Sequence, residues 1–165
     1  MLFSPEAHEA LADEPWSAER ARTEIASIVA DAENVFDDGW PMHPQDVEEG
    51  DDPATRLRTV YLGGAGVVEA LQRLARRGFV ELRRDYVPYL ERSLEAALDF
   101  PDQDAERSLW MGETGVRLVL QRLAPSQANL ERLAELIAAN ERDARCEVMW
   151  GSPGTILAVA SSGST

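Results

Sequence analysis

The sequence contains no lysine, a single cysteine and only two histidines in 165 residues, and aromatic side chains make up only 7%. Because Cys146 is the only cysteine, an internal disulfide bond is excluded. Without lysine, no turn can form the nucleotide-binding loop whose lysine contacts phosphate. The first residues lack the basic and apolar segments of a secretory signal, and no stretch approaches membrane-spanning length. We therefore expect a cytoplasmic protein with no membrane partner.

The charge balance is strongly acidic. Thirty Asp and Glu residues face 16 basic residues, all of them arginine, so that the net charge is −14. A field of this sign repels phosphate backbones and anionic lipid surfaces, which makes nucleic acid an unexpected partner. An apolar content of 44% with few aromatics fits a single helical domain over residues 1–165.

Apolar residues recur at helical spacing in six segments, and no strand-like alternation is sustained. The predicted helices cover residues 18–36, 65–77, 87–99, 115–124, 127–140 and 153–161. Ser17 and Ser126 are suited to cap two of them, and a further short helix is predicted after Ser4 and Pro5. Between the first two long helices, residues 37–53 form a long loop rich in Gly, Pro and acidic residues.

A Gly-x-x-Gly motif occurs three times, each time at the start of a predicted helix. Its glycines are Gly63 and Gly66, Gly112 and Gly115, and Gly151 and Gly154. The first two copies are followed, at the same offset, by the identical run Leu-Gln-Arg-Leu-Ala. The chain is thus an array of helical hairpins over about 18–77, 87–124 and 127–161, in which the second helix is the more apolar and belongs to an inner layer. The glycines could expose helix amides to an anion, but we favour the interpretation that they allow close packing.

Four segments carry a resemblance to a known family: Trp40–Pro44, Tyr61–Val67, Leu109–Gly115 and Met149–Thr155. In combination and order they resemble the N-terminal three hairpins of lanthionine synthetase C-like proteins. The resemblance implies an all-α fold, a partial α/α toroid with its glycine turns gathered at one end. It also implies a role in lanthipeptide biosynthesis, as part of an enzyme that forms thioethers in dehydrated peptides.

The complete family member uses zinc, held by two cysteines and a histidine in later turns. Residues 1–165 contain neither cysteine turn, and Met149 stands where the first zinc cysteine would lie by register. We therefore expect no catalytic residue, no metal ligand and no cofactor in this chain. The expected partners are a peptide or the C-terminal remainder of the toroid.

The remaining chemically active residues give weak signals. His8, His43 and Cys146 lie in distant segments without the close pairing of zinc ligands, and Cys146 is expected to be a small buried hydrophobe. Within the long loop, Trp40, His43 and Asp46 are candidates either for a pocket or for anchoring the loop, and we favour anchoring.

Two other functions stay open at this stage. An α/α-barrel acting on carbohydrate would use paired carboxylates, for which Asp46, Glu113 and Glu147 are the candidates. A helical-repeat module would instead bind a peptide or protein on its concave face. Because three hairpins cannot close a toroid, we also expect Ile156, Leu157 and Val159 to be exposed. The chain should then self-associate there or have a poorly ordered final hairpin, unless a C-terminal partner chain supplies the rest.

Overall fold

The computed structural model describes residues 15–47, 49–50, 52, 54–96, 99–100 and 106–162. These residues form six α-helices and no strand, which confirms the all-α prediction. The helices are α1 (Ala18–Asn34), α2 (Gly64–Arg76), α3 (Val87–Glu95), α4 (Glu113–Leu123), α5 (Gln127–Asn140) and α6 (Ser152–Ser162). The helix predicted after Ser4 and Pro5, and His8 with it, lie outside the described residues. No helix in the described ranges combines the length and apolarity needed to cross a membrane.

Local sequence explains where most of these helices begin and end. The Ser17 and Ser126 hydroxyls accept hydrogen bonds from the amides of Arg20 and Asn129, three residues further on, at 3.2 Å each. The third helix was predicted to reach residue 99, and this is wrong, because Ala96 is extended and α3 ends at Glu95. The Asp99 carboxylate accepts hydrogen bonds from the amides of Arg58 and Thr59, in the segment before α2.

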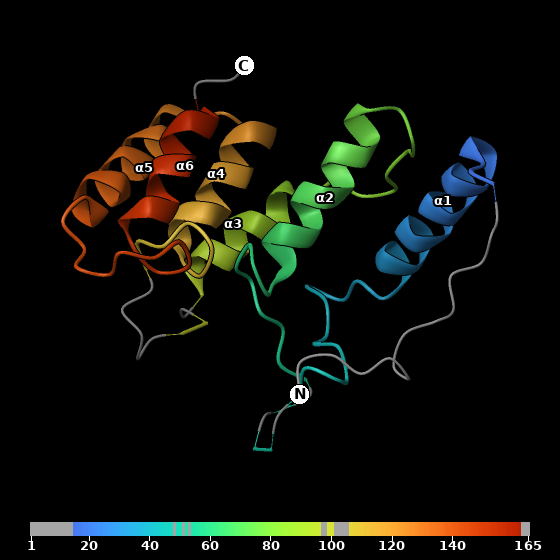
Figure 1. Cartoon of the computed structure of the whole chain (residues 1–165), viewed down its shortest axis with the longest axis horizontal. Coiled ribbons are helices and arrows are strands. Elements are labelled where there is room, and N and C mark those ends of the chain that lie inside the picture. Colours follow the sequence, from blue (N-terminus) through green and yellow to red (C-terminus); the bar gives the residue numbers. More distant parts are fainter. Residues whose placement is uncertain are drawn as a thin grey trace.

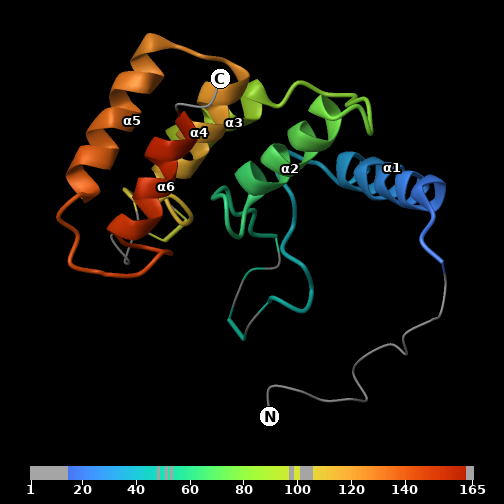
Figure 2. The same ribbon diagram turned by 45° about the horizontal axis from the view of Figure 1, so that its top comes forward.

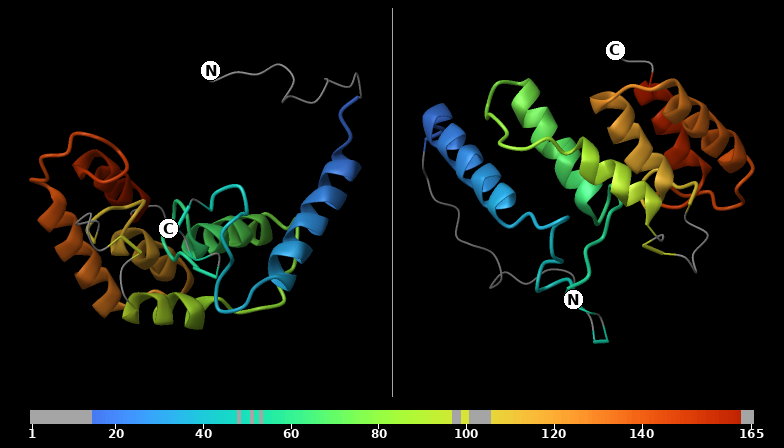
Figure 3. Two further views of the ribbon diagram at one scale, coloured as in Figure 1. Left: turned by 90° about the horizontal axis from the view of Figure 1, so that it is seen from below. Right: turned by 180° about the vertical axis from the view of Figure 1, so that it is seen from behind.

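The six helices form a curved array of two layers. Seen from below, α1, α3 and α5 lie along the outside of the curve, and α2, α4 and α6 lie along its inside (Figure 3). Helix α4 is at the centre and packs against α2, α3, α5 and α6. The hairpin of α5 and α6 lies at one end of the molecule and α1 at the other (Figures 1 and 2).

Two apolar clusters hold the array together. The larger one spans α1, α2, α3 and α4 and includes Val68, Tyr86, Leu90 and Val119, all almost fully buried. The smaller one joins α4, α5 and α6 through Leu109, Leu118, Leu133 and Ala158. Helix α4 contributes to both clusters, so it is buried on nearly all sides.

Helix α1 is attached mainly through its second half and the segment that follows. The ring of Phe36 contacts those of Trp40, Tyr86 and Tyr89 at centroid distances of 4.8 to 5.5 Å. Beside these rings, the buried carboxylate of Glu33 accepts hydrogen bonds from the Arg83 amide at 2.9 Å and the Tyr86 hydroxyl at 3.2 Å. Burial, reinforced by the Glu33 charge, raises the pKa of Tyr86 to about 12.

Tyr86, directly before α3, and Tyr89, within α3, provide a matched pair for a stability test. The Tyr89 hydroxyl is also buried, but it has no hydrogen-bond partner among the described residues. Replacing Tyr86 by Phe should lower the free energy of unfolding by about 1–2 kcal/mol, because it removes a hydrogen bond to a buried carboxylate. Tyr89→Phe should leave it unchanged or raise it slightly, since a buried hydroxyl without a partner is costly. Urea denaturation of both variants measures the difference, and equal losses would contradict this assignment.

Candidate functional site

Three loops of the same design precede the inner helices, and we call them the glycine loops. They comprise residues 57–66, 106–115 and 145–154, and each carries one Gly-x-x-Gly motif. Gly63 and Gly112 are the N-cap residues of α2 and α4, and Gly151 directly precedes α6.

The second glycine of each loop lies against the carbonyl group of the residue six positions earlier. A Cβ atom at this glycine would overlap that carbonyl oxygen in all three loops, at Gly66 on Val60, Gly115 on Leu109 and Gly154 on Val148. The overlap is with backbone, which cannot rotate away. Any side chain at these positions would therefore force the loop away from its helix, and this geometry supports the packing interpretation of the motif.

Internal hydrogen bonds fill the first glycine loop. The amides of Gly63, Gly64, Ala65 and Gly66 donate to the carbonyls of Thr59, Leu57, Arg58 and Gly63 at 2.9 to 3.1 Å. These are the four amides that an α-helix leaves without an intrahelical partner and that an anion would need. The Tyr89 hydroxyl also occupies the space beside Gly64. The turn before α2 therefore has no amide left for an anion.

The three loops contact one another in chain order. The Tyr61 amide donates to the Trp110 carbonyl at 3.0 Å, and the Ser108 hydroxyl donates to the Met149 carbonyl. A methyl group of Val60 would lie 2.6 Å from a Cβ at Gly115. The loops thus share one end of the molecule, and their close approach places α2, α4 and α6 next to one another.

The candidate residues of the long loop are held in different ways. The Trp40 indole donates to the Ala32 carbonyl at 2.8 Å and packs on Tyr86, so it joins the loop to the core. His43 and Asp46 are exposed in a turn closed by a 2.8 Å hydrogen bond from the Asp46 amide to the His43 carbonyl. The His43 ring accepts a further bond from the Gln45 amide at 3.2 Å.

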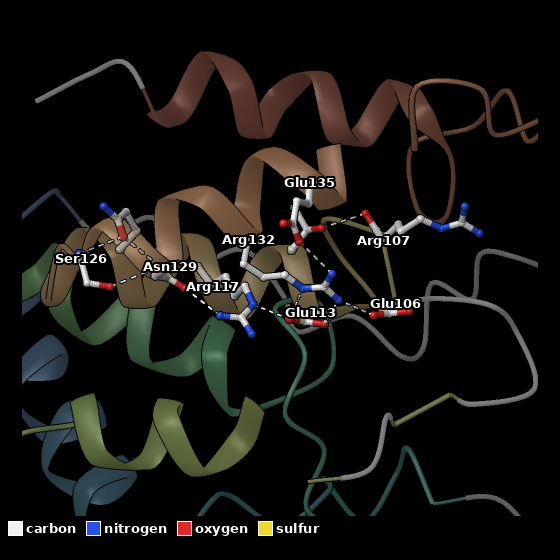
Figure 4. A network of polar contacts seen from close by, with 10 residues as sticks. Glu106, Arg107, Glu113, Arg117, Ser126, Asn129, Arg132 and Glu135 are labelled. Carbon is white, nitrogen blue, oxygen red and sulfur yellow. Dashed lines mark hydrogen bonds and ion pairs between the residues drawn. The ribbon is translucent and has the colours of Figure 1, made fainter. Parts of the chain in front are cut away.

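Glu113 is the centre of an ion-pair network between α4 and α5 (Figure 4). Its carboxylate pairs with Arg117 on its own helix. It also pairs with Arg132 of α5 at 3.2 Å, and Arg132 pairs in turn with Glu106 at 2.6 Å. Burial alone would raise the pKa of Glu113, but the two arginines outweigh it and hold the pKa below its usual value. The hydrogen bond to Glu113 in turn raises the pKa of Arg132.

The other candidate carboxylates are placed differently from Glu113. The Glu147 side chain accepts hydrogen bonds from the amides of Met149, Trp150 and Gly151 at 2.7 to 2.9 Å, which closes the third glycine loop. Asp46 lies exposed in the turn of the long loop. Two of the three carboxylates are therefore occupied by arginines or backbone amides.

Cys146 is exposed, so the prediction that it is a buried hydrophobe is wrong. Its position in the third glycine loop corresponds to Arg58 and Arg107 in the other two, both of which reach partly into solvent. Loop register rather than side-chain polarity therefore decides its exposure. Within the described part of the chain, no three side chains of His, Cys, Asp or Glu gather in a group that could hold a metal ion.

A polar cleft of about 130 Å³ lies beside the first glycine loop, and the sequence did not indicate it. It is lined by Asp38, Arg56, Arg58, Tyr89, Arg92, Ser93 and Ala96. Each arginine in it pairs with an aspartate: Arg56 with Asp37 at 3.3 Å, Arg58 with Asp99 at 3.2 Å and Arg92 with Asp38 at 2.6 Å. The cleft is thus balanced in charge, and its ion pairs join segments that are distant in sequence.

An apolar surface lies along α5 and α6, where two adjoining grooves of about 300 and 290 Å³ share Ile137, Ala138 and Val159. Ile156 and Leu157 of α6 are both exposed, as the sequence analysis expected. We call this surface the terminal face. Its apolar members are Leu130, Ala134, Ile137, Ala138, Ile156, Leu157 and Val159.

Comparisons with protein-family models, with curated proteins and with solved structures found no match to this chain. The class that the geometry defines is therefore an all-α array of helical hairpins joined by stacked glycine loops. The family resemblance stays a prediction from the sequence motifs.

Two substitutions distinguish the steric cost of a side chain in a glycine loop from the cost of a positive φ. Gly115→Ala should lower the free energy of unfolding by roughly 3 kcal/mol, because the new methyl group meets the Leu109 carbonyl and Val60. Gly78→Ala should cost only about 1 kcal/mol, since Gly78 has a φ of +72° but open space around it. Chemical denaturation compares them, and a smaller loss for Gly115→Ala than for Gly78→Ala would contradict the packing role.

Proposed function

We propose that the chain is a lanthionine synthetase C-like scaffold unit, the first three hairpins of a partial α/α toroid, which binds partners and does not itself catalyse. The observation that carries this proposal is the triple repetition of one glycine loop, in which a glycine backbone lies on the carbonyl six residues earlier. Stacking of the loops sets the inner helices side by side, which is the arrangement that the sequence resemblance implies.

The chemistry of the resembled family needs residues that this chain does not offer. Zinc bound by two cysteines and a histidine lowers the pKa of a peptide thiol, which makes it a nucleophile near neutral pH. This chain has one cysteine and two histidines, distant in sequence, and Met149 occupies the register position of the first zinc cysteine. Its own residues stack the loops, bury the inner helices and present the terminal face.

A second candidate function is that of a general helical-repeat module for peptide or protein binding. The terminal face favours it, since large exposed apolar surfaces commonly mark interaction sites. The carbohydrate-active alternative is less favoured, because Glu113 is committed to two arginines and Glu147 to three backbone amides. A general acid or base in a carbohydrate-active enzyme must be able to donate a proton to the substrate or accept one from it.

The scaffold role predicts that the purified chain neither binds zinc tightly nor forms thioethers. Metal analysis after dialysis should find well below one zinc per chain, because the sequence has a single cysteine and cannot supply two thiolate ligands. Incubation with a dehydrated, cysteine-containing peptide should leave its thiol open to alkylation, which mass spectrometry detects. One tightly held zinc per chain that is lost in Cys146→Ala would overturn the assignment.

A further inference from the structure

The repeat register shows which positions on α6 another hairpin should cover. Counted from the first glycine of each loop, Ser152, Ile156 and Leu157 of α6 correspond to Glu113, Arg117 and Leu118 of α4. Both helices begin directly after that glycine, so their faces can be compared residue by residue.

In α4 these positions make the contacts to the next hairpin along the chain. Glu113 binds Arg132 at 3.2 Å, and Arg117 binds the Asn129 side chain at 3.1 Å, both on α5. Leu118 packs in one apolar cluster with Ala158 of α6. The corresponding residues Ile156 and Leu157 are 67% and 46% exposed. Two of the three positions that α4 uses to bind a hairpin are therefore exposed in α6, and the third, Ser152, is half-buried.

The chemistry of the positions changes between the two helices. Where α4 has a carboxylate and a guanidinium, α6 has a hydroxyl and an isoleucine, and residues 152–162 contain no ionisable side chain. Among the described residues that line the two grooves of the terminal face, Glu141 alone is ionisable. A partner surface that packs there should be largely apolar, because a charge buried without a partner is strongly unfavourable.

Two surfaces of the chain itself can be compared with this requirement. The first is α1, the outer helix at the opposite end, which would dock in a head-to-tail arrangement. With their serine caps aligned, Arg20, Thr23 and Glu24 of α1 correspond to Asn129, Arg132 and Leu133 of α5, the side that packs toward α4. This side of α1 is polar and does not match an apolar groove.

The second surface is the terminal face itself. We propose that the terminal face binds the terminal face of a second copy of the chain about a two-fold axis, with α5 and α6 of each copy forming a four-helix interface. Apart from Glu141, the two grooves are lined by uncharged residues, so two copies meet there with few like charges together, although each carries a net charge of −14. The proposal rests on the repeat register, the apolar grooves and the exposed residues of α6, and it does not need the family assignment.

Two isoleucines of equal exposure provide the test. Ile156 lies in the terminal face and is 67% exposed, whereas Ile28 lies on α1 and is 66% exposed. Sedimentation or light scattering of the full chain should show a concentration-dependent dimer. Ile156→Asp should weaken dimerisation by ~100-fold or more, because each interface then buries two carboxylates, while Ile28→Asp should leave it unchanged. Circular dichroism checks that both variants keep their helices.

A strictly monomeric wild-type chain at about 0.5 mM, a concentration at which even a weak dimer would be populated, would overturn the proposal. Equal weakening by Ile156→Asp and Ile28→Asp would also overturn it, because the terminal face would then have no special part in association.

Cysteine cross-linking separates the two-fold arrangement from a head-to-tail one. In a Cys146→Ser background, Ile156→Cys should form an intermolecular disulfide with a second Ile156→Cys chain on mild oxidation, and Ile28→Cys should not. A mixture in which position 156 of one copy links only to position 28 of another would show head-to-tail association and contradict the proposal.

Discussion

A single close contact, in which a glycine backbone lies on the carbonyl oxygen of the residue six positions before it, sets the architecture of this protein. The contact fixes how each glycine loop turns into its inner helix, at Gly66, Gly115 and Gly154 alike. Because the three loops are built in the same way, the first hydrogen-bonds to the second and the second to the third. The inner helices then start from a common end, and the outer helices pack around them.

Arginine–carboxylate pairs add a second set of constraints between hairpins. Glu69 of α2 binds Arg122 of α4 at 2.8 Å, and Glu113 of α4 binds Arg132 of α5 at 3.2 Å. Each of these carboxylates also binds an arginine on its own helix. Each is therefore a partly buried anion that two arginines share. The planar guanidinium group suits such shared contacts better than a lysine would, because it donates in several directions at once. The large excess of acidic residues in this chain ensures that arginines have carboxylates within reach.

The sequence predicted what depends on local patterns and missed what depends on distant segments. Helical periodicity and serine caps are local, and the glycine motif repeats with its flanking residues, so the all-α class and the packing role of glycine could be derived. The polar cleft could not, since Arg56, Arg92 and Asp99 come together only after folding. Only the spacing of Glu113 and Arg117, four residues apart, could have indicated the ion-pair network. The expectation for Cys146 failed because average burial of cysteine says nothing about its position in a repeat, where the other copies have arginine.

The central place of α4 has a consequence for how the molecule opens. In a linear array of repeats, local stability depends on the neighbours of each unit, and end units have fewer of them. Helix α4 touches helices on both sides and belongs to both apolar clusters, so exposing its amides to solvent requires the loss of contacts on both sides and should need the highest free energy. The first half of α1 is exposed and can fray at far lower free energy, which would make hydrogen exchange slowest in the middle of the sequence and faster toward α1. The free energy of local opening thus differs along the chain and depends on how many neighbouring helices each helix has.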